Sequence, residues 1–310
     1  MSNLHHGEQE AESPLLGGLR WAVILSLLIL GIESIGAYFS HSLSLTVDAV
    51  HNVPDILAFA VSWTALLGTR EGASPEYTFG THRKEIFAGI FNGAIVLATG
   101  LAFGVEALLS LVSGRPFAGA VDPVWLLLAA VPTLALRMVN LRLLGKMPGR
   151  IRDLNVSSVM VHMASDVAIT ATLLVAGAAL LFFPSLFETD AVGALVIAAI
   201  LVYESWPLLR EGWEVLTERT PRGMSTDSLT KAALEVPGVL EIHDIHVWAV
   251  CSTLVCMTAH VEVRDMPLPD AMSVIQRLRE RMSKEFGIAH STFEMECHLP
   301  RRSPPDALSR

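Results

Sequence analysis

Long runs of apolar residues alternate with short polar segments along the first two thirds of the chain. A helix that crosses a bilayer needs about 20 predominantly apolar residues. Six windows meet this requirement, approximately Leu19–Phe39, Ser44–Leu67, Ile86–Val112, Val124–Leu144, Val156–Phe183 and Ala191–Leu209. The pattern predicts a six-helix transmembrane domain over residues 19–212, after a disordered N-terminal segment over residues 1–18. The first run lacks a basic n-region and a cleavage site, so we interpret it as a retained helix.

After Arg210 the pattern becomes that of a soluble domain. It predicts a helix over about Thr226–Glu235, strands at "VLEIHDIHVWAV" and "STLVCMTAHVEV", a helix at "DAMSVIQRLRERMSKEF" and a last strand at "STFEMECHL". This αββαβ order is typical of a small open sheet with its helices on one face. We therefore predict an α+β domain over residues 213–298, followed by a tail over residues 299–310.

Composition agrees with a membrane protein. Hydrophobic residues make up 52% of the chain and charged residues only 17%, with a mean hydropathy of +0.48, whereas soluble domains carry about 25% charged residues. The net charge of -9 argues against nucleic acid as a partner. The three cysteines have no disulfide-type spacing, which favours reduced thiols.

Basic residues divide the connections between the predicted spans into two groups. The first, third and fifth connections together contain only one Lys or Arg. The second and fourth contain six: Arg70, Arg83, Lys84, Lys146, Arg150 and Arg152. Because cytoplasmic loops carry an excess of Lys and Arg, we expect both termini in the cytoplasm. Since nothing indicates an organelle, we expect a multi-pass protein of the bacterial plasma (inner) membrane.

Ionisable residues recur at one spacing inside two apolar windows. The stretch "SLTVDAVHNVPDILAFAVSW" contains Asp48, His51 and Asp55, and the fifth window contains His162 and Asp166. Residues four apart lie on the same face of a helix. An Asp at the centre of a transmembrane helix costs about 2.5–3.5 kcal/mol, a cost that a shared cation would offset. Two imidazoles and two carboxylates are suited to a tetrahedral Zn²⁺ site.

These pairs also have a structural alternative, in which each is a hydrogen-bonded contact between helices. Their repetition in two spans favours metal binding. A metalloprotease is disfavoured because the helical His-Glu-x-x-His arrangement is absent from the sequence. No Ser or Cys nucleophile constellation occurs in the spans, so we expect that the protein is not an enzyme. Further ionisable residues of the windows are interpreted as helix-packing pairs: Glu33, Glu106, Arg137 and Glu204.

Several motifs together resemble the cation diffusion facilitator family, in its zinc-transporting branch. They are the paired His-x-x-x-Asp, "SHSLSLTVDAVHNVPD", "YTFGTHRKEIFAGIFNG", "LLREGWEVLTERTP" and "VPGVLEIHDIHVW" with "AHVEV". The resemblance implies a homodimeric metal/proton antiporter with six transmembrane helices and a cytoplasmic ferredoxin-like domain. By motif position, it implies His51, Asp55, His162 and Asp166 as transport ligands. Manganese-type relatives have Asp where His51 stands, so the histidine favours Zn²⁺, followed by Cd²⁺ and Co²⁺.

The sequence departs from the family pattern at three places. Pro54 stands inside the first motif, where Ser, Thr or Gly is expected, and a proline can kink the helix. The connection "GKMPGRIRDLNV" lacks the His-rich tract of many zinc members. Thr81 occupies a position at which some relatives have His, which disfavours a second metal site around His82.

Two further residues are candidates for the ion path. Asp48 lies one turn before His51, and we expect it to line the exit path; a carboxylate favoured by the helix N-terminus is an equal alternative. Asn155 lies two turns before His162 and is a candidate for guiding ions inward.

The resemblance also implies a regulatory metal site in the cytoplasmic domain, formed by His243, His260 and Glu296. His290, Cys297 and His298 lie nearby in sequence. His243 and His260 fall on adjacent strands, where they could meet across the pair. Strand alternation places His243 and Asp244 on opposite faces. The alternative is that these histidines are ordinary surface groups.

Three functions remain open from the sequence. The favoured one is a secondary transporter, surrounded by membrane lipid, that exports Zn²⁺ in exchange for protons through the helical His/Asp site. The second is an exporter of another divalent ion, Cd²⁺, Co²⁺, Fe²⁺ or Mn²⁺. The third is a non-transporting membrane sensor or partner that binds metal through its cytoplasmic domain.

Overall fold

The chain divides into two compact units, Met1–Gly212 and Trp213–Arg310. The computed structural model describes residues 21, 23–68, 74–145, 155–183, 186, 188–252 and 254–297, with the side chains of 58–68, 143–145 and 155–161 excepted. The predicted segments 1–18 and 299–310, together with His298, lie outside the described residues.

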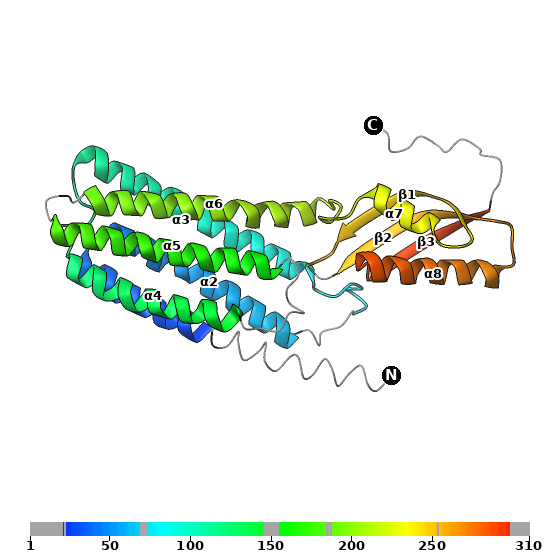
Figure 1. Ribbon diagram of the computed structural model, residues 1–310, viewed down its shortest axis with the longest axis horizontal. Helices are drawn as coiled ribbons and strands as arrows, with labels where there is room; N and C mark the ends of the chain where they lie inside the picture. Colours follow the sequence, from blue (N-terminus) through cyan, green and yellow to red (C-terminus); the bar gives the residue numbers. More distant parts are fainter. Residues whose placement is uncertain are drawn as a thin grey trace. The chain divides into compact units, whose positions relative to one another are not determined.

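Long helices form the first unit (Figure 1). A first helix, Val23–Ser40, is followed by α2 (Leu43–Gly68), α3 (Arg83–Ser113), α4 (Pro123–Gly145), α5 (Asn155–Phe182) and α6 (Glu188–Leu216). Among the described residues, five of these helices are long and apolar enough to cross a membrane. The other, α2, has 26 residues and is therefore about 39 Å long, more than the hydrocarbon core of about 30 Å. The predicted helical membrane class is confirmed.

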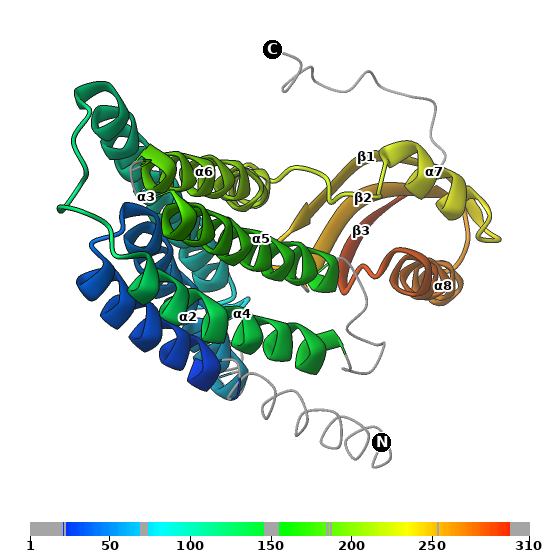
Figure 2. The ribbon, with the colours of Figure 1, turned by 60° about the vertical axis from the view of Figure 1, so that its left-hand side comes forward.

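Helices α3 and α6 pack closely through small residues, and they lie side by side in Figure 2. A Cβ atom added at Gly100 would lie 3.0 Å from Val202 Cγ2 and 3.1 Å from the carbonyl oxygen of Ala198. One turn later, Gly104 faces the Ala198 side chain at 3.5 Å. Small residues four apart let helix backbones approach in a membrane, where van der Waals packing drives association.

A buried carboxylate fixes the start of α2 against the start of α6. The hydroxyls of Ser42 and Ser44 each donate to Asp190 Oδ1 at 2.5 Å, and the Leu43 N–H donates to Oδ2 at 2.6 Å. Asp190 is only 3% exposed, and an anion at a helix N-terminus is stabilised by its unpaired N–H groups. We call this end of the bundle the Asp190 end; α2 and α6 begin there, and α5 ends there.

The second unit is an open sheet with helices on one face. Its elements are α7 (Thr226–Leu234), β1 (Val239–Ala249), β2 (Val255–Val263), α8 (Leu268–Phe286) and β3 (His290–Cys297). The sheet order is β1-β2-β3, with β1 antiparallel and β3 parallel to β2. Helices α7 and α8 bury Leu229, Leu278 and Met282 against the sheet, and the other face of the sheet carries polar residues. The predicted αββαβ domain is confirmed.

One detail of β1 differs from the sequence expectation. The pairing of β1 with β2 shifts between His243 and His246, and Asp244 adopts a left-handed backbone with φ 49°. Such a bulge breaks strand alternation. The expectation that His243 and Asp244 face opposite sides is therefore wrong: Asp244 Oδ2 lies 3.6 Å from His260 Nε2, on the same face as the histidine pair.

Replacing Asp190 should destabilise the bundle. In Asp190→Ala, two hydroxyls and the N–H groups of Leu43 and Ser44 lose this acceptor, and each buried group left unpaired costs about 1–3 kcal/mol. We expect the Tm of the purified protein in detergent to fall by roughly 5 °C or more, measured by intrinsic fluorescence. Glu188→Ala is the control, because Glu188 is in the same first turn but exposed. An equal Tm for both variants would contradict the role of the Asp190 contacts.

Candidate metal centres

Helices α2 and α5 bring the four candidate transport ligands together. His51 Nε2 lies 3.5 Å from Asp55 Oδ2 and 3.8 Å from Asp166 Oδ1. His162 Nε2 lies 3.3 Å from the same Asp55 oxygen. The two imidazole centroids are 6.0 Å apart. Ligand atoms of His51, Asp55 and Asp166 thus lie within 4.8 Å of one another, and His162 adjoins this group through Asp55.

The donor set fits a divalent cation. Bonds of about 2.0–2.2 Å to a tetrahedral zinc ion separate its ligand atoms by about 3.4 Å, and the measured separations of 3.3 to 3.8 Å are close to that value. Among the described residues, both ring nitrogens of His51 and Oδ1 of Asp166 are buried without a hydrogen-bond partner. Because buried polar atoms are normally paired, these atoms are available as ligands.

The exposed fractions of the ligands indicate which side of the site is open. The His51 and Asp55 side chains are 1% and 8% exposed, whereas those of Asp166 and His162 are 18% and 31% exposed. His162 Nδ1 also lies 4.0 Å from Glu204 Oε2 on α6. Glu204 is a contact of the site that sequence reasoning assigned to helix packing; a single Glu in an apolar run does not reveal which neighbour it faces.

Asp48 lies outside this group of four. Its Oδ1 accepts a hydrogen bond of 2.8 Å from Arg137 Nη2, and Arg137 also pairs with Glu33 at 3.4 Å. The role of Asp48 in an exit path therefore stays a prediction. In the structure its carboxylate is paired with the Arg137 guanidinium. Asn155 begins α5, but its side chain lies outside the described part of the chain. His82 directly precedes α3, at its N-cap.

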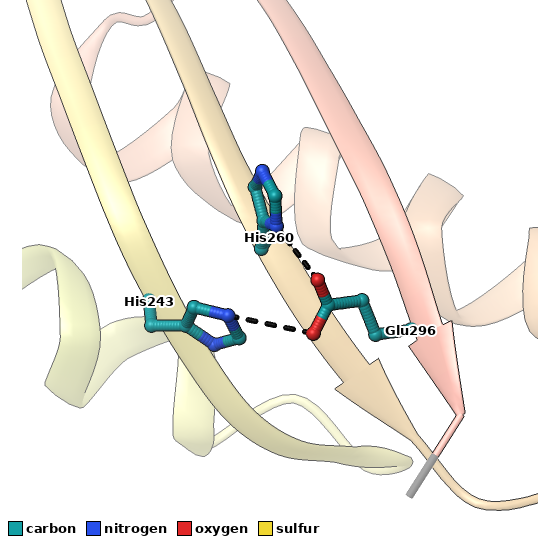
Figure 3. A group of neighbouring side chains, drawn as sticks. All are labelled: His243, His260 and Glu296. Atoms are coloured by element: carbon teal, nitrogen blue, oxygen red, sulfur yellow. Dashed lines mark hydrogen bonds and ion pairs between the residues drawn. The ribbon is translucent and has the colours of Figure 1, made fainter. Parts of the chain in front are cut away.

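A second group of candidate ligands lies on the polar face of the C-terminal sheet (Figure 3). His243 of β1 is paired in register with His260 of β2. Glu296 of β3 places Oε1 2.7 Å from His260 Nδ1 and Oε2 3.4 Å from His243 Nε2. Ligand atoms of the three residues all lie within 4.8 Å of one another. One residue from each strand thus contributes to a site that is partly open to solvent.

Acidic groups surround the second ring nitrogen of His260. Asp244 Oδ2 lies 3.6 Å and Glu294 Oε2 3.7 Å from its Nε2. The hydrogen bond with Glu296 raises the pKa of His260 above its ordinary value, and the nearby carboxylates add to this rise. Metal binding at this site must therefore displace a more tightly held proton than an isolated histidine carries.

Comparison with protein families identifies both units. Residues 19–217 match the cation efflux transmembrane domain, and residues 221–298 match the cytoplasmic domain of cation efflux proteins. The chain belongs to the cation efflux family. It is therefore a multi-pass membrane protein of a transporter family, and its second unit is the family's cytoplasmic domain.

Curated relatives cover most of the chain. The metal cation efflux system protein CzcD of Cupriavidus metallidurans is 29% identical over 90% of this chain and 85% of its own length. The zinc transporter ZitB of Pectobacterium atrosepticum is 28% identical over 94% and 88%, respectively. A cadmium, cobalt and zinc/H(+)-K(+) antiporter of Bacillus velezensis is 28% identical over 86% and 83%. These similarities support efflux of divalent metal.

The raised pKa of His260 gives a pH prediction for the cytoplasmic site. Because Glu296 holds the proton on His260, metal affinity should fall as pH decreases through that raised pKa. In the metal-free protein, Glu296→Gln should lower the pKa of His260, measured by histidine NMR with His260→Asn for assignment. Glu294→Gln is the matched comparison: its carboxylate lies 3.7 Å from His260 but is mostly exposed, so its removal should lower the pKa of His260 less than Glu296→Gln does. An unchanged pKa in Glu296→Gln would contradict this account.

Proposed function

We propose that the protein exports Zn²⁺ from the cytoplasm in exchange for protons, with His51, Asp55, His162 and Asp166 as ligands of the transported ion. The observation that carries the proposal is the cluster of His51, Asp55 and Asp166, with His162 against Asp55, at neighbouring separations that suit ligands of a tetrahedral zinc ion. Membership of the cation efflux family supports it.

Protons are the counter-ions that this donor set favours. A histidine binds metal only when its ring nitrogen is deprotonated, so zinc and protons compete for the same atoms. Imidazole titrates near neutral pH, which makes His51 and His162 the proton carriers after zinc leaves. Moving Zn²⁺ out of a negative-inside cell costs about 4.6 kcal/mol per 100 mV, at about 2.3 for each charge. Each proton that enters offsets half of the charge moved.

Zinc is favoured over the other divalent ions by the ligand types. Imidazole nitrogen suits Zn²⁺, whereas carboxylate, carbonyl and water oxygens suit Mn²⁺. Relatives named for zinc, cadmium and cobalt support the same group of ions. Cd²⁺ and Co²⁺ are therefore the next candidates, ahead of Fe²⁺ and Mn²⁺.

We further expect a homodimer in the bacterial inner membrane, with both termini in the cytoplasm. The distribution of Lys and Arg among the connections supports this orientation. The match to the cytoplasmic domain of cation efflux proteins supports the location of the second unit. His243, His260 and Glu296 would there bind a regulatory zinc ion, since their partly exposed ligand atoms can exchange metal with the cytosol.

The cytoplasmic cluster also favours one alternative, a non-transporting metal sensor. In that case the domain would bind zinc while the membrane residues serve only helix packing. The two functions differ in whether the residues of α2 and α5 are required for metal movement.

Zinc uptake into proteoliposomes under an imposed pH gradient tests the proposal. The wild type should accumulate zinc with a counterflow of protons, followed with a fluorescent zinc indicator and a pH dye. Asp166→Ala removes a ligand, and we expect its uptake to fall below about 1% of wild type, because even outer-shell changes cost 10–100-fold.

Glu76→Gln is the matched control, because it removes a carboxylate from an exposed position outside the membrane helices. It should transport zinc like the wild type. If wild type and Asp166→Ala both fail to move zinc while binding it through His243 and His260, the sensor alternative is correct.

A further inference from the structure

A buried guanidinium lies beside the transport site. Arg137 of α4 donates from Nη2 to Asp48 Oδ1 at 2.8 Å and to Asn52 Oδ1 at 3.3 Å. The same nitrogen lies 3.4 Å from Glu33 Oε1, and the Asn52 amide donates to the other Glu33 oxygen. Arg137 is 5% exposed, and Asp48 and Glu33 are fully buried. One cation thus pairs with carboxylates of the first helix and of α2.

The other half of the guanidinium binds α5. Arg137 Nη1 donates to the carbonyl oxygen of Asp166 at 2.5 Å and to Thr170 Oγ1 at 2.6 Å. Thr170 follows Asp166 by one turn toward the Asp190 end, where α5 ends. Asp48 precedes His51 by one turn toward the same end, where α2 begins. Arg137 therefore joins the two ligand-bearing helices on the Asp190 side of the site.

Exposure differs between the two sides of the ligands. The His162 side chain is 31% exposed, whereas Asp48 and Thr170, the next polar residues toward the Asp190 end, are fully buried. An ion held by the four ligands would be less covered by protein on the His162 side. On the opposite side it meets Arg137 and the residues bound to it.

The groups around Arg137 are those that a hard cation prefers. Asp48, Glu33 and the Asn52 amide supply oxygen atoms, which Mn²⁺ and Mg²⁺ favour. Among the described residues, Asp48 Oδ2 and Glu33 Oε1 are buried and accept no hydrogen bond. Two carboxylates thus surround one guanidinium, and a buried anion left without a cation is costly.

We propose that Arg137 is a tethered cation that closes the transport site toward the Asp190 end. Its guanidinium pairs with the Asp48 and Glu33 carboxylates, which a departing metal ion meets next. The inference rests on the proposed function. During transport the guanidinium must leave Asp48 for the ion to pass. By holding these carboxylates at other times, Arg137 prevents them from retaining an ion as a second metal site.

Manganese binding to Arg137→Gln tests this occupancy. The purified full-length variant should bind one more Mn²⁺ per protomer than the wild type, counted by electron paramagnetic resonance with Mn²⁺ as the only added metal. The cytoplasmic site is the same in both proteins, so it cancels from the difference. Zinc turnover should fall about tenfold, because an ion held at the added site must leave before the next one passes.

Two variants separate occupancy from a purely structural role. Arg137→Lys keeps the charge, so it should bind no additional Mn²⁺ and retain most of its turnover. Asp48→Asn combined with Arg137→Gln removes one charge of each sign, so the additional Mn²⁺ should disappear. If Arg137→Gln fails to fold but the double variant folds, the pair with Asp48 is required for folding, and a role of Arg137 beyond the fold is contradicted.

Other outcomes overturn the inference. If Arg137→Gln folds but binds no additional Mn²⁺, whatever its zinc turnover, Arg137 does not hold a cation site closed. If neither Gln variant folds, Arg137 is required for the fold regardless of Asp48, which also contradicts the proposal. Failure of the wild type to move zinc would instead overturn the proposed function, and the Mn²⁺ count would still report on the occupancy.

Discussion

A carboxylate buried inside an apolar bundle requires a cation close to it. The arrangement of this transmembrane domain depends on that requirement. Four carboxylates lie near one another on three helices: Glu33, Asp48, Asp55 and Asp166. Arg137 pairs with only the first two. The other two face histidines, which are neutral unless protonated. Their neutralisation therefore depends on a metal ion or protons from outside, which is the property an exchanger needs.

Fixed contacts between the helices hold the unpaired carboxylates in position. Asp190 anchors the start of α2 to the start of α6, and Arg137 connects α2 with α5 beyond the ligands. Both contacts use charge-assisted hydrogen bonds, which are stronger than neutral ones. The ligands themselves have few such contacts, since His51 has no hydrogen-bond partner among the described residues. The rigid contacts hold the helices, and the ligands remain available to the ion.

Sequence reasoning identified the features that depend on local periodicity. The spacing of His51 with Asp55 and of His162 with Asp166 places each pair on one helix face, and the apolar windows predict the helices. It could not identify the partner of Arg137, because the pairing depends on how α4 rotates against α2. The bulge at Asp244 was missed for a related reason. Strand alternation assumes regular pairing, and an extra residue in β1 reverses the face on which the following side chains lie.

The two candidate metal centres differ in what it costs to leave them empty. At the cytoplasmic cluster, water reaches His243 and Glu296, which are each about 40% exposed, so solvent can compensate their charges when metal leaves. The membrane cluster has less access to water, and its Asp55 is 8% exposed. Under the proposed function, a departing ion there is replaced by protons on the same ligands. The exposed cluster therefore suits reversible sensing, while the buried cluster suits the proposed exchange of metal for protons.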